Sequence, residues 1–218
     1  MVGLLLGASL FSMFFFITLY MQQVLHYSPI HAGLSYLPLA LTIIVAAGAG
    51  GQLVTRFGFK PILAAGMALI AAGLLWFHGI ATHGSFLADI LGPSLLAALG
   101  LGFGFVTSTI AAVSGVKDRE QGLASGLINT SQQVGGALGL AVLSTIANSR
   151  TDHLFAQGAN QAHALTEGFQ AAFLAGAGIA VLGLIASLTL IRGRDSRAHV
   201  EMSNGGGAEG EPQPVPAG

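Results

Sequence analysis

The side chains best suited to bind a polar ligand are three amides in an apolar run. Asn129, Gln132 and Gln133 are spaced i, i+3 and i+4, with Gly136 at i+7, so a helix would place all four on one face. Amides that face lipid would leave donors and acceptors unpaired. We therefore expect this face to meet either a water-filled cavity or neighbouring helices, with which Asn and Gln commonly form hydrogen bonds. The residues alone leave the two roles equally open.

A second feature is the stretch GGQLVTRFGFKP, which contains the first formally charged side chains of the sequence, Arg56 and Lys60. They flank Gly58, which can adopt the backbone angles of a sharp bend. The plainest interpretation is a tight turn between two apolar segments, held on the cytoplasmic side by its basic residues.

Other polar residues lie near the predicted ends of apolar segments. Gln22 is interpreted as an interfacial anchor or as the rim of a pathway, and Tyr36 as an interfacial residue followed by a helix kink at Pro38. The loop histidines could indicate an external metal site or pH sensor, but ordinary loop composition explains them better, since no pair has ligand spacing. Catalytic motifs are absent from the sequence, so we expect neither an enzyme nor a cofactor.

Composition identifies the medium around these residues. The 218-residue chain is 53% hydrophobic and 8% charged, whereas soluble domains carry about 25% charged residues. This predicts an integral membrane protein with the lipid bilayer as its partner. The net charge of −1 gives no basic excess for nucleic acid, and the absence of cysteine excludes disulfides and thiolate metal sites.

Charge placement divides the chain into six uncharged runs. Each is long enough for a helix to cross a hydrocarbon core of about 30 Å, which takes about 20 residues. The sequence therefore predicts an all-α bundle over residues 1–192 and a disordered cytoplasmic tail over residues 193–218. The predicted spans are residues 2–24, 33–54, 61–81, 90–116, 123–147 and 169–191.

The basic residues predict the orientation of the bundle. Six spans place both termini on one side, together with the second and fourth connections. That side carries all basic residues except Arg150, and it is therefore predicted to be cytoplasmic. An apolar run that begins at residue 2 suggests a segment of a longer protein. The basic residues on the predicted cytoplasmic side are Arg56, Lys60, Lys117, Arg119, Arg192, Arg194 and Arg197.

Two stretches, LYMQQVLHYSPIHAGLSYLPLA and GLASGLINTSQQVGGALGLAVLSTIA, are similar to the carboxy-terminal part of the fourteen-helix drug:proton antiporters of the major facilitator superfamily. The resemblance covers nearly all of residues 1–192. The family's loop motif is also recognisable, although Thr55 replaces its acidic residue, which puts a full-strength conformational latch in doubt. The residues that match the loop motif are Gly51, Leu53, Arg56, Gly58 and Lys60.

The resemblance implies one six-helix half of a multidrug exporter in the bacterial inner (plasma) membrane. Its first, second, fourth and fifth helices would face a central cavity, which favours cavity lining for the amides. The proton gradient would drive the export of amphipathic small molecules. The partner of this half would be a missing amino-terminal half or a second copy of the chain. The alternative is a non-transporting scaffold or truncated product. The implied cavity candidates are Asn129, Gln132, Gln133, Gln22 and Tyr36, and the implied gating loop contains Gly51, Arg56, Gly58 and Lys60.

Overall fold

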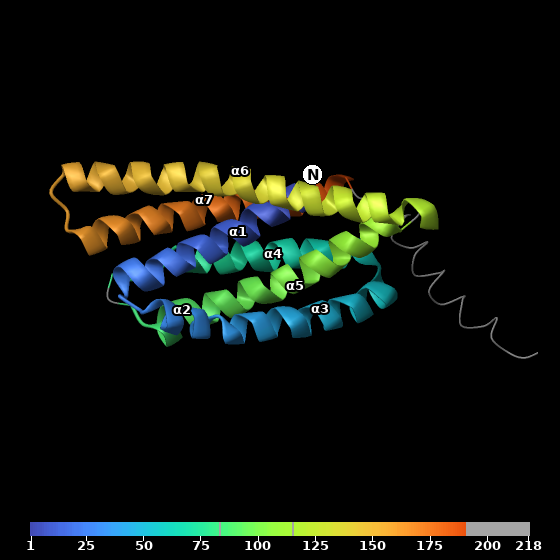
Figure 1. Ribbon diagram of the computed structural model, residues 1–218, viewed down its shortest axis with the longest axis horizontal. Coiled ribbons are helices and arrows are strands. Elements are labelled where there is room, and N and C mark those ends of the chain that lie inside the picture. Colours follow the sequence, from blue (N-terminus) through green and yellow to red (C-terminus); the bar gives the residue numbers. More distant parts are fainter. Residues whose placement is uncertain (83, 115, 191–218) are drawn as a thin grey trace, which may run out of the picture.

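The computed structural model describes residues 1–190 apart from residues 83 and 115, so the predicted tail lies outside the described residues. Within the described part the regular structure is entirely helical, which confirms the all-α prediction. Two π-helical segments, Tyr20–Val24 and Phe86–Leu91, extend α1 and precede α5. The α-helices (Figure 1) are α1 (Val2–Leu19), α2 (Pro29–Ser35), α3 (Leu37–Phe57), α4 (Phe59–Phe77), α5 (Gly92–Val113), α6 (Gln121–Ala156) and α7 (Gln161–Leu190).

The connection between α1 and α3 contains a short helix of its own. Ser28 caps the start of α2, and its hydroxyl accepts a hydrogen bond from the His31 amide at 3.2 Å. The predicted kink at Pro38 is wrong in position, because the helix is interrupted at Tyr36 and α3 begins just before the proline. Proline is tolerated in a first helical turn, where its missing N–H would have no intrahelical acceptor.

Five helical stretches among the described residues are long and apolar enough to cross a membrane: Val2–Val24, Pro29–Phe57, Phe59–Phe77, Asp89–Val113 and Gln161–Leu190. The prediction of six such spans is therefore supported for five. α6 is longer than any of them but falls outside this group, because its amides and the charged residues near its end lower its mean hydropathy.

α6 also continues to Ala156, well past the predicted span 123–147. Most of the predicted connection 148–168 is helical, because a charged residue ends an apolar run without breaking a helix. Contacts with α7 support this extension. The Thr151 hydroxyl donates to the Ala164 carbonyl at 3.2 Å, and Arg150 pairs with Glu167 at 2.9 Å.

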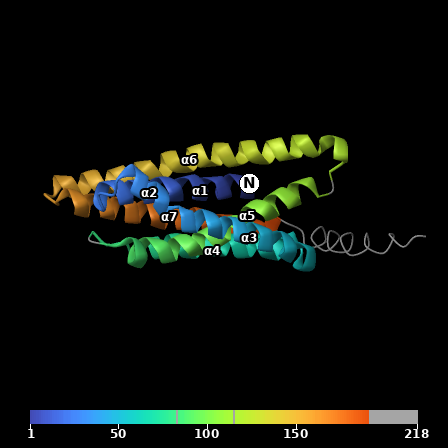
Figure 2. The same ribbon diagram turned by 60° about the horizontal axis from the view of Figure 1, so that its bottom comes forward.

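The helices form one bundle in which α5 lies between α3 and α4, and α7 lies between α4 and α6 (Figures 1 and 2). α1 packs against α6 and α7. The core is rich in aromatic residues where α1, α4 and α7 meet. The Phe77 and Phe173 rings stack with centroids 4.8 Å apart, and Phe16 contacts Phe173 edge-on at 6.1 Å.

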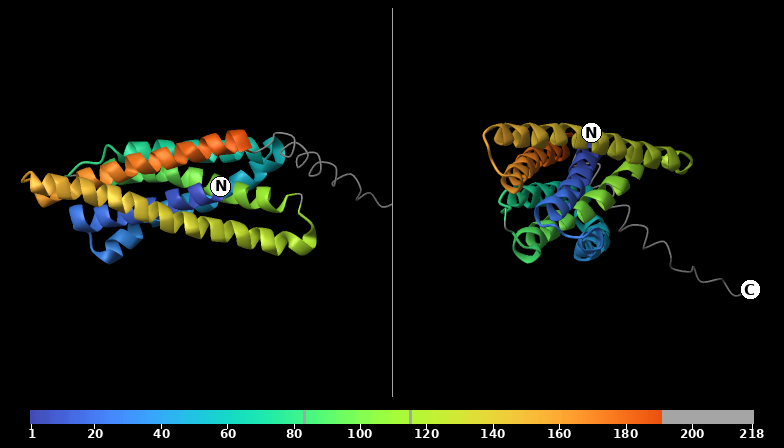
Figure 3. Two further views of the ribbon diagram at one scale, coloured as in Figure 1. Left: turned by 90° about the horizontal axis from the view of Figure 1, so that it is seen from above. Right: turned by 60° about the vertical axis from the view of Figure 1, so that its left-hand side comes forward.

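The basic turns lie at the same end of the bundle. Figure 3 shows the α3–α4 turn and the α5–α6 connection at one end, and the α4–α5 and α6–α7 connections at the other. The first two contain Arg56, Lys60, Lys117 and Arg119, whereas Arg150 lies near the opposite end. Successive long helices run in opposite directions, and the basic side chains of these connections therefore gather at one end of the bundle.

Glycines allow α4 and α5 to cross closely. A Cβ atom added at Gly100 would lie 2.5 Å from the Gly66 carbonyl oxygen, and one added at Gly66 would lie 3.0 Å from the Gly104 amide nitrogen. Real side chains do not tolerate such distances, so the two backbones are in direct contact. Gly66, Gly100 and Gly104 thus form a close crossing of small residues, as is common between membrane helices.

Candidate functional site

The three amides of α6 lie in two different environments. Gln132 is buried, with 6% of its surface exposed, whereas Asn129 and Gln133 are exposed. The Gln132 Nε2 atom is buried and has no hydrogen-bond partner among the described residues. The predicted stripe therefore divides into one buried amide at a helix contact and an exposed pair.

Small residues bring α1 and α6 together around Gln132. A Cβ atom added at Gly7 would overlap the Gln132 carbonyl oxygen, and one added at Gly135 would overlap the Leu4 carbonyl oxygen. Gly139 meets α1 in the same way one turn further along. The prediction that Gly135 and Gly139 serve packing is confirmed, and the same crossing covers Gln132.

An aromatic ring of α1 lies near one of the exposed amides. The Phe11 ring lies directly against Gly136, which follows Gln133 by three residues and so lies on the same side of α6. Phe11 exposes 45% of its surface. The exposed surface near Gln133 thus combines an amide group with an aromatic ring, which suits a ligand that is partly apolar and partly polar.

The other cavity candidates lie elsewhere: Tyr36, between α2 and α3, contacts α1, and Gln22 lies in the π-helical segment that extends α1. The Tyr36 hydroxyl donates to the Phe14 carbonyl at 2.9 Å and lies 2.7 Å from the Thr18 Oγ1, and its ring stacks on Phe14. Gln22 is half-buried in the π-helical segment. Since Gln22 follows Phe11 by eleven residues, it lies about 16 Å beyond it along the helix axis. These two residues are not brought together with the α6 amides.

Tyr20, which the sequence marks as an interfacial anchor or the rim of a pathway, is fully buried and donates to the Ala81 carbonyl at 2.6 Å. Gln170 of α7 similarly donates through Nε2 to the Ile80 carbonyl at 2.7 Å. Together they fasten the connection after α4 to α1 and α7. No sequence signal identifies the acceptors, because both are main-chain atoms in an irregular segment.

The hydroxyls of α5 behave differently from one another. Thr109 donates to the Phe105 carbonyl at 3.0 Å, as hydroxyls in membrane helices commonly do. Thr107 and Ser108 differ, because their hydroxyl oxygens are buried without a partner among the described residues.

The basic turn consists of little more than Gly58. α3 ends at Phe57 and α4 begins at Phe59, with Gly58 between them at φ 81° and ψ 169°. These angles are essentially restricted to glycine, which confirms that Gly58 permits the bend. Gly51 lies in α3, six residues before its end, and the Val106 side chain would be 3.8 Å from a Cβ atom added there.

The basic side chains of the turn differ in exposure, since Arg56 is exposed and Lys60 is half-buried. Thr55, where the family motif has an acid, donates its hydroxyl to the Gln52 carbonyl at 2.7 Å. Gln52 and Arg56 line a shallow hollow of about 210 Å³ on α3 together with Ala49 and Leu53. At position 55, therefore, a hydroxyl bonded to its own helix takes the place of a carboxylate.

The described residues contain no cluster of three or more His, Cys, Asp or Glu side chains that could hold a metal ion. The His31 ring stacks on Tyr27 with centroids 4.1 Å apart, and His153 bonds to Gln157 at 2.9 Å. These contacts fit ordinary surface roles. His83 lies outside the described residues.

Comparison with known proteins places these features in context. The family model described as Major Facilitator Superfamily matches residues 1–140. The chain is 40% identical over 149 residues to the cephamycin export protein CmcT of Amycolatopsis lactamdurans, which covers 68% of this chain and 31% of that protein. It is 30% identical over 196 residues to the puromycin resistance protein pur8 of Streptomyces alboniger, covering 87% and 39% respectively.

A third relative is the multidrug resistance protein B homolog of Mycobacterium tuberculosis strain H37Rv. It is 34% identical over 151 residues, which cover 68% of this chain and 28% of the relative. The matched part of the chain therefore spans less than two fifths of each of these three relatives.

Proposed function

The chain belongs to the major facilitator superfamily, and from that premise we propose that it is the carboxy-terminal, six-helix part of a proton-coupled multidrug exporter. It is a multi-pass membrane protein of a transporter family and not an enzyme. The proposed substrates are amphipathic small molecules. They leave the cell in exchange for protons as two six-helix bundles rock about a central site.

The observation that carries this proposal is the exposed pair of amides, Asn129 and Gln133, on α6, with the partly exposed Phe11 ring against Gly136 about one turn from Gln133. Lipid cannot satisfy an amide, so these side chains need protein, water or a ligand across from them. A cavity wall provides that setting. The amides would bind polar groups of the substrate, and the Phe11 ring would contact its apolar part.

The proposal requires a second wall. α3 exposes large apolar side chains along much of its length, including Leu37, Leu41, Ile44 and Val45. The matched part of the chain spans less than two fifths of each of three relatives described as export or resistance proteins. We therefore propose that an amino-terminal half, or in its place a second copy, completes the cavity. The chain alone is expected not to transport.

We further propose that α6 crosses the membrane as the fifth of six spans, with both termini cytoplasmic in the bacterial plasma membrane. The uncharged stretch of α6 from residue 121 to residue 149 is long enough for a crossing. The basic residues gathered at one end of the bundle support the orientation. Cysteines introduced singly at Ser125 and Asn148 should react with a membrane-impermeant thiol reagent from opposite sides.

A proton-driven efflux assay tests the function. Vesicles carrying the chain together with an amino-terminal half should extrude a fluorescent amphipathic dye when a proton gradient is imposed, and should stop when the gradient is collapsed. Vesicles carrying the chain alone should show no efflux. Gradient-dependent efflux by the chain alone would contradict the need for a partner, and its absence from the complete assembly would contradict the exporter proposal.

The alternative of a non-transporting scaffold is favoured by one observation, the burial of Gln132 in the α1–α6 crossing. A scaffold needs its polar residues for packing alone. The scaffold alternative predicts that Asn129→Ala and Gln133→Ala affect stability or assembly and leave the substrate range of any complete transporter unchanged.

A further inference from the structure

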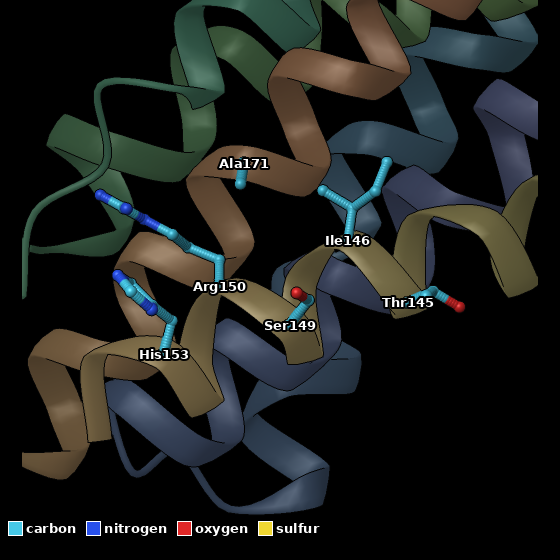
Figure 4. Close-up of a pocket in the computed structure, with 6 residues that line it drawn as sticks. All are labelled: Thr145, Ile146, Ser149, Arg150, His153 and Ala171. Atoms are coloured by element: carbon cyan, nitrogen blue, oxygen red, sulfur yellow. The ribbon is translucent and has the colours of Figure 1, made fainter. Parts of the chain in front are cut away.

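A groove lies between α6 and α7 near the end of the bundle opposite the basic turns. It encloses about 490 Å³. Figure 4 shows that Arg150 and His153 extend to the same side of α6 there. We propose that this groove binds a zwitterionic aminophospholipid, with the phosphate at Arg150 and an acyl chain along the apolar floor. The lining residues are Thr145, Ile146, Ser149, Arg150, His153 and Ala171.

The position of the groove along the helices fits a lipid. Arg150 is the first charged residue of α6, and Ile146 lies one turn closer to the uncharged part of the helix. Ala171 belongs to the apolar stretch of α7. The groove therefore runs from a charged rim to an apolar floor, as the boundary between headgroups and hydrocarbon requires.

The rim offers hydrogen-bond donors to a phosphate. Arg150 donates from Nη2 to the Glu167 Oε2 at 2.9 Å, a bond that uses one of its five N–H donors. Gln157 donates from Nε2 to the His153 Nε2 at 2.9 Å, so that ring nitrogen accepts and the Nδ1–H is the donor. Ser149, the residue before Arg150 on α6, adds a hydroxyl to the lining.

The charges around the rim favour a zwitterionic headgroup over an anionic one. Glu167 pairs with Arg150, so the two charges cancel and the rim offers no net attraction to an anionic headgroup. A headgroup with an ammonium can place its phosphate at Arg150 and its ammonium at Glu167. The ion pair is accessible, with 46% and 29% of the two side chains exposed. Exposed ion pairs contribute little to stability, so a headgroup can share this one at low cost.

The inference depends on membrane embedding and not on the proposed transport activity. Its test is native mass spectrometry of the full chain in detergent, with phosphatidylethanolamine or phosphatidylglycerol added at equal concentration. The chain should retain more phosphatidylethanolamine. Arg150→Gln should lower that retention about fivefold, the contribution typical of one basic residue at a lipid surface. Arg56→Gln, the same change at the opposite end, should leave it unaltered.

A second variant keeps the test decisive if Arg150→Gln fails to fold. Ala171→Leu fills the floor without changing charge and should also reduce lipid retention, with helix content checked by circular dichroism. Equal or greater retention of phosphatidylglycerol would overturn the proposal. So would equal losses in Arg150→Gln and Arg56→Gln, or unchanged retention in Ala171→Leu.

Discussion

Gly7 of α1 lies so close to the main chain of Gln132 in α6 that a methyl group at position 7 would overlap the Gln132 carbonyl oxygen. Gly135 and Gly139 extend this contact along the crossing. Membrane helices gain little hydrophobic energy from each other, because lipid is as apolar as their side chains, so close packing of small residues contributes much of their association. The α1–α6 contact therefore depends on the absence of side chains at these glycines.

Gly7→Ala should lower the free energy of unfolding by about 1–3 kcal/mol, the usual cost of overpacking a tight contact. Chemical unfolding in detergent, followed by far-ultraviolet circular dichroism, measures the change. Gly178→Ala is the matched control, because an added Cβ at that helical position meets nothing within 4 Å. The control should be neutral or slightly stabilising, since alanine favours a helix over glycine. A Gly7→Ala variant as stable as the wild type would show that the crossing relaxes freely.

Gly58→Ala should destabilise the α3–α4 turn by about 1–3 kcal/mol, because the φ of 81° and ψ of 169° lie in a region that side chains rarely occupy. The same unfolding assay applies, and efflux by the assembled transporter should also fall. Gly51→Ala serves as the control, since its Cβ would make an ordinary contact at 3.8 Å with Val106. If both substitutions have the same effect, the turn has adjusted its backbone and the strain argument fails.

The sequence predicts well those features that depend on a local stretch of chain and on whether it lies in water or in lipid. The uncharged runs locate five candidate spans, because charged residues are costly in hydrocarbon. The bend at Gly58 and the crossing at Gly100 follow from the small size of glycine and its freedom of backbone angle. Each of these features depends on a local stretch of chain and its surrounding medium.

What the sequence could not predict depends on distant residues. The helical spacing of α6 places Gln132 and Gln133 next to each other on one face. Gln132 is buried because Gly7, far earlier in the chain, packs against it, whereas Gln133 stays exposed. The helical continuation to Ala156 likewise packs against α7, where the buried Thr151 hydroxyl donates to the Ala164 carbonyl across the hairpin. Helical spacing identifies a face of a helix but not the helix that covers it.

Tyr36→Phe should lower the free energy of unfolding by about 0.5–1.5 kcal/mol, because it removes a hydrogen bond while keeping the ring stacked on Phe14. Thr18→Val should cost a similar amount. The double variant should cost less than the sum, since the two hydroxyls lie 2.7 Å apart. Additive losses would mean that the hydroxyls do not interact.

Asn129→Ala and Gln133→Ala should alter efflux in the assembled transporter and leave unfolding of the bundle unchanged, because both side chains are exposed on α6. The measurement is a panel of dyes that differ in polar groups. The expected result is a changed ranking of the dyes, since each lost amide contact affects some substrates more than others. Thr130→Ala, at another exposed position of α6, is the control. An unchanged ranking in both amide variants would favour the scaffold alternative.

Gln132→Met should leave the free energy of unfolding unchanged or raise it, by up to about 1–3 kcal/mol. The reason is that a buried amide nitrogen without a partner incurs a desolvation cost that an apolar side chain of similar length avoids. Gln133→Met is the matched control, and its exposed amide predicts no comparable gain. Unfolding in detergent distinguishes the outcomes. A loss of stability specific to Gln132→Met would mean that the amide bonds another helix and that Gln132 belongs to the packing of the bundle. A gain, combined with reduced efflux in the assembled transporter, would mean that its nitrogen finds a partner only during transport.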